Sequence, residues 1–255
     1  MTAAFTAFRM QLRLAFRTPN FWMAQSTAPP QTLLFLSVID AFDRPDLVVH
    51  ALLAPMLVSM WGTAVWTGGA VVRDDRWSGR LELHAASPTN YGIVVAARVG
   101  AVVLLSLLTV PITLFTAWAT YRVTLSVAHP WLLSTVLVTT ALAITATGVI
   151  FTSMTILSRV GNTFQNSASY PLLLLGGAFV PLALLPGWVH PLGRLVFLSW
   201  SSDLLRDAVT DPTVTRWPAR LGMVVLLGGL GFLIGQRLIR VIMRRVAVTG
   251  TLSSS

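Results

Sequence analysis

The longest charged interruption between two apolar runs, residues 73–90, groups several side chains that could do chemistry. It reads RDDRWSGRLELHAASPTN and holds three arginines, two adjacent aspartates and Glu82, the only glutamate of the chain. Long apolar runs precede and follow it. Charges of both signs around Trp77 and Leu81 are typical of a protein-binding surface, in which a polar rim surrounds apolar anchors. The stretch is therefore predicted to be a polar surface between two membrane spans that a partner protein contacts, although its charge alone favours a solvated loop.

Catalytic chemistry has little support elsewhere in the chain. Three of the four histidines, His50, His129 and His190, fall in predicted outer loops, and His84 falls in 73–90. An intramembrane hydrolase needs Ser, His or Asp to converge in the bilayer, and the sequence has neither an HEXXH motif nor paired carboxylates within a span. The absence of Cys removes thiolate metal sites and disulfides. No catalytic residue and no metal site is predicted.

The composition indicates an integral membrane protein. Of 255 residues, 55% are hydrophobic and 11% are charged, and the mean hydropathy is +0.73. A soluble domain has about 25% charged residues, so the deficit favours several membrane-spanning helices. The net charge of +9 could indicate nucleic acid, but in a membrane protein anionic lipid and the positive-inside rule explain it better. Membrane lipids are therefore expected partners, and nucleic acid is not.

The N-terminal segment 3–18 has the pattern of an amphipathic helix. Its apolar residues recur at spacings of three and four, and its arginines recur every four on a neighbouring stripe. The two stripes are Phe5, Phe8, Leu12 and Phe16, and Arg9, Arg13 and Arg17. Such a helix lies in the headgroup layer, with its rings toward the acyl chains. A soluble amphipathic helix is the alternative, but the membrane segments that follow favour the interfacial position.

Six segments are long and apolar enough to cross a bilayer at about 20 residues per span. They are 21–40, 51–72, 91–120, 131–157, 166–185 and 219–239. The first contains Pro29 and Pro30, which lack backbone donors and must kink or break the helix. Its polar residues need protein or water partners, so this span is predicted to face helices or a cavity, unless it is merely bent. We expect one all-α transmembrane domain over 1–255.

The segment 186–212 is predicted to stay at the outer membrane surface. Its apolar part, 188–200, has about 13 residues and is too short to span a bilayer. We expect two short helices that dip into the outer interface, with Trp188 and Trp200 as interfacial anchors.

The arginines are divided unevenly between the two sides of the membrane. With six spans both termini lie on one side. That side holds twelve arginines, in the N-terminal segment, 73–90 with Arg98, the 158–165 turn and the C-terminal tail, and the other side holds six. The positive-inside rule therefore places both termini and 73–90 in the cytoplasm.

The segment VVRDDRWSGRLELHAASPTNYGIVVAARV resembles the first cytoplasmic loop of type-2 ABC exporter permeases of the daunorubicin-resistance-like kind. The family's loop is a charged run, then Gly, Thr, Leu, Glu, two apolar residues, a small residue and Pro. The matching residues are Gly79, Leu81, Glu82, Leu83, Ser87 and Pro88. Arg80 stands where Thr is usual, and His84 where Leu is usual. RTPNFWMAQSTAPPQTLLF and YPLLLLGGAFVPLALLPGW resemble the family's first and fifth spans.

The resemblance implies a half-transporter. Two permease subunits, identical or different, would pair, and two cytoplasmic ABC ATPase subunits would dock below them. The elbow helix would be 3–18, the coupling helix would lie in 73–90, and 186–212 would be outer re-entrant helices that gate the exit. The implied docking residues are Arg73, Asp75, Trp77, Gly79, Arg80, Leu81, Glu82 and Leu83, and the implied outer-gate residues are Pro186, Trp188 and Trp200.

Nucleotide chemistry is expected outside this chain. The sequence has no Gly-rich loop ending in Lys-Ser/Thr that would hold phosphates. ATP and Mg²⁺ would therefore bind the partner ATPase, whereas this chain would bind no cofactor and would not be an enzyme by itself.

The transport pathway is expected between the two permeases, near a set of amide and hydroxyl side chains. These are Gln25, Thr27, Gln31, Asn162, Gln165 and Asn166, which could alternatively only join helices. The expected function is export of an amphipathic or hydrophobic compound (drug, antibiotic or lipid) across a bacterial plasma membrane. An ion-coupled secondary transporter, which needs intramembrane carboxylates or a repeat, and a non-transporting membrane scaffold are the alternatives.

Overall fold

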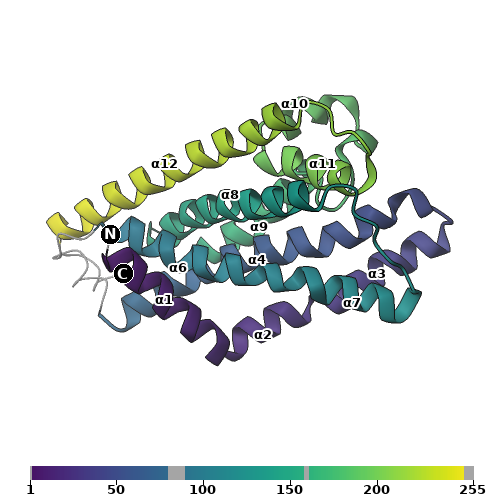
Figure 1. Cartoon of the computed structure of the whole chain (residues 1–255). Helices are drawn as coiled ribbons and strands as arrows, with labels where there is room; N and C mark the ends of the chain where they lie inside the picture. The colour runs from purple at the N-terminus through teal and green to yellow at the C-terminus, as the bar shows by residue number, and fades with distance from the viewer. Residues whose placement is uncertain (1, 80–89, 158–160, 250–255) are drawn as a thin grey trace.

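A computed structural model of the chain describes residues 2–79, 90–157 and 161–249, and within these ranges the backbone forms helices and no strand (Figure 1). The α-helices are α1 (Thr2–Arg17), α2 (Pro19–Ser26), α3 (Ala28–Ala41), α4 (Val48–Trp77), α6 (Tyr91–Leu105), α7 (Thr109–Tyr121), α8 (Pro130–Leu157), α9 (Gly161–Leu175), α10 (His190–Arg194), α11 (Phe197–Thr210) and α12 (Trp217–Thr249). Short 3-10 turns are η1 (Pro45–Leu47), η2 (Ser106–Leu108), η3 (Leu182–Leu184) and η4 (Gly187–Val189). The predicted all-α class is confirmed.

Four helical segments of the described chain are long and apolar enough to cross a membrane. They are Pro45–Val71, Tyr91–Tyr121, Pro130–Met154 and Trp217–Arg244. The second joins α6, η2 and α7 into one continuous rod, because both caps of the 3-10 turn keep helical backbone angles. These segments coincide with the predicted spans 51–72, 91–120, 131–157 and 219–239.

The other two predicted spans are broken helices, so the count of six spans stays a prediction. In 21–40, helices α2 and α3 meet at Thr27. Pro29 and Pro30 lie in the first turn of α3, where a helix needs no backbone donor. In 166–185, helix α9 ends at Leu175, and a turn through Gly177, whose φ is +67°, follows.

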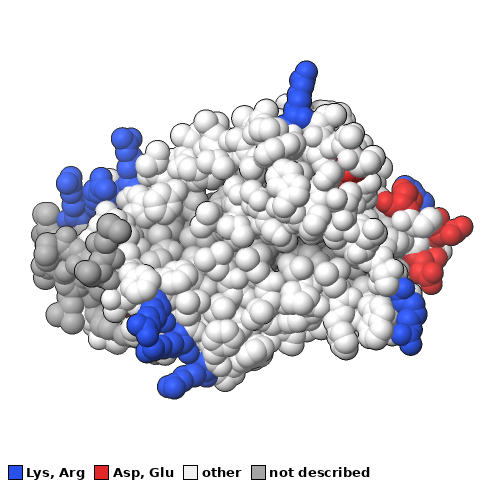
Figure 2. Space-filling view, in the orientation of Figure 1, with Lys and Arg blue, Asp and Glu red and all other residues white. Residues whose placement is uncertain are grey.

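The helices run along a common axis and bring distant parts of the chain to the same end (Figure 1). The start of α1, the end of α4, the start of α6 and the end of α12 lie at one end of the bundle. The α3–α4 corner and helices α10 and α11 lie at the other. Basic side chains gather at the first end, and the acidic side chains visible in Figure 2 lie at the second.

The core is formed where α4, α6, α8 and α12 meet, and α8 is its central helix. Buried side chains of α4 and α8, such as Leu57, Met60 and Ile144, fill it. Helix α12 packs closely on α8 through Gly228, where an added Cβ would lie 2.7 Å from the Ala143 Cβ. Small residues at such contacts allow helices to approach closely in lipid, where no hydrophobic force drives them together.

The glycine pair on α12 tests this packing. Gly228→Ala should lower the free energy of unfolding, because overpacking a tight contact typically costs about 1–3 kcal/mol. The neighbouring Gly229 has no atom within 4 Å of an added Cβ, so Gly229→Ala should keep or raise stability, since Ala favours a helix over Gly by about 1 kcal/mol. Melting of the detergent-purified variants, followed by tryptophan fluorescence, measures both. Equal melting temperatures would contradict the close α8–α12 contact.

Candidate functional site

A buried ion pair joins the two helices that flank the predicted docking stretch. Asp75, near the end of α4, is 1% exposed. Arg98 of α6 donates from Nη1 to both carboxylate oxygens of Asp75 at 3.1 and 3.0 Å, and the Tyr91 hydroxyl donates to Asp75 Oδ2 at 3.0 Å. Arg98 Nε also donates to Gln11 Oε1 of α1 at 3.1 Å. We call these four residues the clamp, because they bind α1, α4 and α6 together.

Local capping fixes the ends of the helices beside the clamp. Gly79 follows α4 with φ +66°, a left-handed conformation that glycine adopts without steric cost and that commonly ends helices. Asn90 begins α6, and its Oδ1 accepts from the Gly92 amide at 3.1 Å. The Gly92 carbonyl accepts from Gln236 Nε2 of α12 at 2.9 Å. The clamp therefore lies where four helices are tied together.

Two adjoining cavities run along one face of α4. The first, about 390 Å³, lies between α2–α3, α4 and α9, and the second, about 480 Å³, lies between α1–α2, α4 and α6 and includes Asp74 and Arg98. They share Ala24, Thr27, Thr63 and Trp66. We call them the upper and the lower cavity. Because Arg98 lines the lower cavity, the clamp and both cavities form one connected region.

The break between α2 and α3 places polar groups at these cavities. The Thr27 hydroxyl donates to the Ala24 carbonyl at 2.7 Å, and the backbone N–H of Gln31 donates to the Thr27 carbonyl at 3.3 Å. The Gln25 carbonyl, which loses its usual helical partner because Pro29 has no N–H, accepts from the Thr27 backbone N–H instead. Thr27 and Gln31 line the upper cavity from this side, and Asn166 lines it from α9.

The remaining predicted pathway residues do not line either cavity with a described side chain. Gln25 is buried, and its Oε1 accepts from the Thr109 hydroxyl at 2.6 Å. Gln165 is also buried and donates from Nε2 to the Phe151 carbonyl at 2.9 Å. Both amides join helices, which is the alternative that the sequence left open. The side chain of Asn162 lies outside the described residues.

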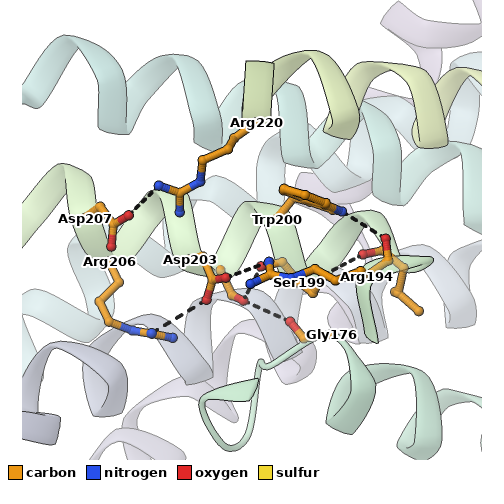
Figure 3. A network of polar contacts seen from close by, with 10 residues as sticks. Gly176, Arg194, Ser199, Trp200, Asp203, Arg206, Asp207 and Arg220 are labelled. Atoms are coloured by element: carbon orange, nitrogen blue, oxygen red, sulfur yellow. Dashed lines mark hydrogen bonds and ion pairs between the residues drawn. The ribbon is translucent and has the colours of Figure 1, made fainter. Parts of the chain in front are cut away.

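Opposite the clamp, helices α10 and α11 form a hairpin held by polar contacts (Figure 3). Arg194 pairs with Asp203 at 2.8 Å, and its guanidinium lies 4.7 Å from the centre of the Trp200 ring. Trp200 Nε1 donates to the Arg194 carbonyl at 2.9 Å. The Ser202 hydroxyl donates to the Gly176 carbonyl at 2.9 Å, so the hairpin is tied to the turn after α9.

Of the predicted outer-gate residues, Trp200 therefore holds the hairpin together, whereas Pro186 and Trp188 are exposed. Asp207 pairs with Arg220, which joins α11 to α12 (Figure 3). His50 was expected in an outer loop but is buried in the first turn of α4. There its Nε2 lies 2.9 Å from the Phe179 carbonyl.

The model of the ABC-2 type transporter family matches residues 2–209. The chain belongs to the ABC-2 type transporter family. The matched range contains the clamp, both cavities and nearly all of the α10–α11 hairpin. Members of this family are transmembrane permease subunits without an ATP-binding domain of their own, so an ABC ATPase is implied as a partner. A search of curated proteins found no significant match.

The structure of this permease places the predicted docking residues in three groups. Asp75 is buried in the clamp, where its carboxylate is paired with Arg98. Gly79 is exposed at the end of α4. Arg73 and Trp77 belong to α4, but their side chains lie outside the described residues, and so do Arg80, Leu81, Glu82 and Leu83. Docking by the latter residues stays a prediction.

Sequence reasoning missed three of the four clamp residues. Arg98 had been counted only toward the charge bias, and Tyr91 and Gln11 had no assigned role. One signal was present, because Arg98 is the only charged residue of an apolar run, YGIVVAARVGAVVLL. A charge within such a run needs a partner.

Asp75→Ala should destabilise the permease strongly, because it leaves Arg98 largely buried without a counter-charge. Breaking a buried ion pair from one side typically costs about 3–5 kcal/mol. Asp74→Ala is the matched control, since Asp74 is exposed and should change stability little. Asp75→Leu, Arg98→Met and the variant with both substitutions form a double-mutant cycle, in which the double variant should recover much of the loss of the single ones. Additive losses in this double-mutant cycle, read from melting temperatures, would show that the pair does not act as a unit.

Proposed function

We propose that this permease exports an amphipathic or hydrophobic compound (drug, antibiotic or lipid) from a bacterial cell, using ATP hydrolysed by separate ABC ATPase subunits. The observation that carries the proposal is the connection between the clamp and the cavities. Helix α4 holds Asp75 near one end and forms a wall of both cavities along its length. A force applied at 73–90 therefore reaches the place where a cargo could sit.

The basic end of the molecule is assigned to the cytoplasm of a bacterial plasma membrane. Exposed arginines of α1 and α12 lie at this end. The exposed Asp40, Asp43 and Asp46 belong to the α3–α4 corner at the opposite end (Figure 1), where Figure 2 shows acidic side chains. Cytoplasmic loops carry an excess of basic residues. Phe5 and Phe16 of α1 are exposed beside its arginines, which fits an elbow helix in the headgroup layer. Both termini then lie in the cytoplasm.

Coupling is assigned to 73–90, seated in a groove of the ATPase. Two ATPase subunits would bind ATP with Mg²⁺, close on each other and push the coupling segments of two permease subunits, identical or different. Because the clamp joins α1, α4 and α6, these helices would move as one body, and a packed interface of this kind switches between discrete states. The broken helices α2–α3 and α9 border the upper cavity and would complete the pathway between the two subunits.

Ion coupling is the second candidate, and the structure supports it less. A secondary transporter needs carboxylates within the membrane. Over residues 2–79, 90–157 and 161–249, the four long apolar helices carry no carboxylate near their middle. A non-transporting scaffold would not need cavities that connect to the docking end.

Two substitutions in 73–90 test the coupling. Glu82→Arg reverses the only glutamate, and Leu81→Asp places a charge in the expected apolar contact with the ATPase. Each should abolish co-purification with the ATPase or, in proteoliposomes, lower transport and the stimulated ATPase rate at least tenfold. Asp43→Arg, a charge reversal at the opposite end, is the control and should retain both. If Glu82→Arg and Leu81→Asp leave assembly and transport intact, coupling does not occur at this segment.

The orientation is tested by thiol labelling, because the sequence contains no Cys. Ser78→Cys and Thr210→Cys each add one thiol at an exposed position, at opposite ends of the bundle. A membrane-impermeant maleimide added to intact cells should label Thr210→Cys, and it should label Ser78→Cys only after permeabilisation. The opposite pattern would reverse the assigned orientation.

A further inference from the structure

The lower cavity is charged at one end and mainly apolar along the rest of its length. Among its described lining residues, the two charged ones are Asp74 of α4 and Arg98 of α6. The wall that α4 contributes runs from Asp74 to Thr63, which is about 16 Å at 1.5 Å per residue. Its apolar side chains include Phe21, Met23, Ala70, Val71 and Val102. The cavity therefore has the polarity of an elongated amphipathic ligand.

The charges at this end do not cancel. Arg98 is paired with Asp75 at 3.0 Å. Asp74 is exposed, and in the described chain only its backbone carbonyl accepts hydrogen bonds, from Ser78. Two carboxylates and one guanidinium leave a net charge of −1. Arg98 Nη2 makes no hydrogen bond to the described residues and is not one of their buried atoms, so this end offers both an acceptor for a cation and a donor for an anion.

The surroundings of the cavity indicate the depth of lipid headgroups. One wall is α1, the amphipathic helix assigned to the headgroup layer. At the corner between α1 and α2, the rings of Phe16, Phe21 and Trp22 pack together with centres 5.5–6.2 Å apart. Trp22 is 50% exposed, and aromatic side chains of this kind gather where membrane meets water. The charged end of the cavity thus lies among headgroups and its apolar end among acyl chains.

We propose that the lower cavity holds a phospholipid whose headgroup has a primary amine beside its phosphate, as in phosphatidylethanolamine. The ammonium donates to the Asp74 carboxylate, the phosphate accepts from Arg98 Nη2, and part of an acyl chain lies along α4 toward Thr63. Both headgroup contacts are charge-assisted hydrogen bonds, which are about twice as strong as neutral ones. The lipid is a resident of this cavity and not the exported cargo, so the proposal does not depend on the proposed function.

The charge and the donors of the headgroup decide which lipid fits. Phosphatidylglycerol brings a phosphate without an ammonium to an end that already has a net negative charge. Phosphatidylcholine has a cation, but its quaternary nitrogen has no N–H to donate to Asp74. An ammonium has three such donors. Phosphatidylethanolamine alone among these three satisfies both Asp74 and Arg98.

A second copy of the chain is the competing occupant, because Met23 and Trp66 at the rim are 67% and 59% exposed. The shape of the cavity favours the lipid. One occupant has to meet Asp74 at one end and apolar surface about 16 Å deeper along α4. A single phospholipid does both, since its headgroup and its acyl chain are joined.

Native mass spectrometry of the purified full-length chain in detergent tests the proposal. Phosphatidylethanolamine, phosphatidylcholine and phosphatidylglycerol, all with palmitoyl and oleoyl chains, are titrated, and the Kd of the first bound lipid is compared. The Kd for phosphatidylethanolamine should be at least tenfold lower than for the other two. Free phosphoethanolamine has the same headgroup without acyl chains, and its Kd should be at least a hundredfold higher than that of the lipid.

Two substitutions place the lipid in this cavity. Asp74→Asn removes the charge with little change of volume, and it should raise the phosphatidylethanolamine Kd about tenfold, equivalent to about 1.4 kcal/mol. Ala70→Trp fills the cavity and should weaken phosphatidylethanolamine binding at least tenfold. Asp43→Asn is the matched control, because Asp43 is exposed at the opposite end of the bundle, and its Kd should equal that of the wild type.

The lipid series on the wild type needs no variant, so misfolding of Ala70→Trp leaves the proposal testable. Equal Kd values for the three lipids, or an unchanged phosphatidylethanolamine Kd in Asp74→Asn, would overturn it. So would phosphoethanolamine that binds as tightly as the lipid, which would assign the site to a soluble phosphate ester. A changed oligomeric state of Ala70→Trp with unchanged lipid binding would assign the cavity to a second copy. None of these results would affect the proposed function, which ATPase stimulation and transport test separately.

Discussion

The ion pair between Asp75 and Arg98 is the interaction on which the working parts of this permease depend. Asp75 is 1% exposed, and burying a carboxylate is unfavourable unless a counter-charge and hydrogen bonds compensate; Arg98 and Tyr91 supply them. Because Asp75 lies near the end of α4 and Arg98 in the third turn of α6, the pair sets where the chain leaves one membrane helix and enters the next. Gln11 attaches α1 to the same point. One interaction thereby holds α1 and the two helices that flank 73–90 together.

The second constraint comes from the membrane, in which every backbone donor and acceptor must be satisfied internally. Helix breaks are tolerated there only where protein or water covers them. Both breaks of this permease meet that condition. At the first break, the Thr27 hydroxyl donates to the Ala24 carbonyl. After α9, Gly177 and Ala178 donate to carbonyls of the last helical turn, and Ser202 covers the Gly176 carbonyl. The breaks border the upper cavity, so the segments least suited to lipid are those nearest to the proposed cargo.

The four long helices could be predicted to within a few residues, because a long apolar run is the strongest signal that a membrane protein sequence carries. The breaks were less predictable. Pro29 and Pro30 indicated a break, but proline is favoured in the first turn of a helix, so the break lies before them, at Thr27. The predicted pathway residues were also only partly right. Thr27 and Gln31 line the cavity and Gln25 does not, because a shift of two residues turns a helix by about 200°. Composition alone does not show which face of a helix is buried. Likewise, only tertiary packing shows that Asp75 and not its neighbour Asp74 meets Arg98, 23 residues further along the chain.

Charged and uncharged polar groups lie in different places in this permease, because burial in a low dielectric costs an ion far more free energy than a neutral group. Paired charges hold the two ends, with Asp75 and Arg98 at one and the Asp203–Arg194 and Asp207–Arg220 pairs at the other. Between them the upper cavity is lined by amides, hydroxyls and aromatic rings, whose desolvation costs far less than that of an ion. An empty cavity lined by neutral groups therefore costs less free energy than one that contains an unpaired charge at the same depth. The proposed transport cycle requires this property, because its cavity would be emptied and refilled in each cycle.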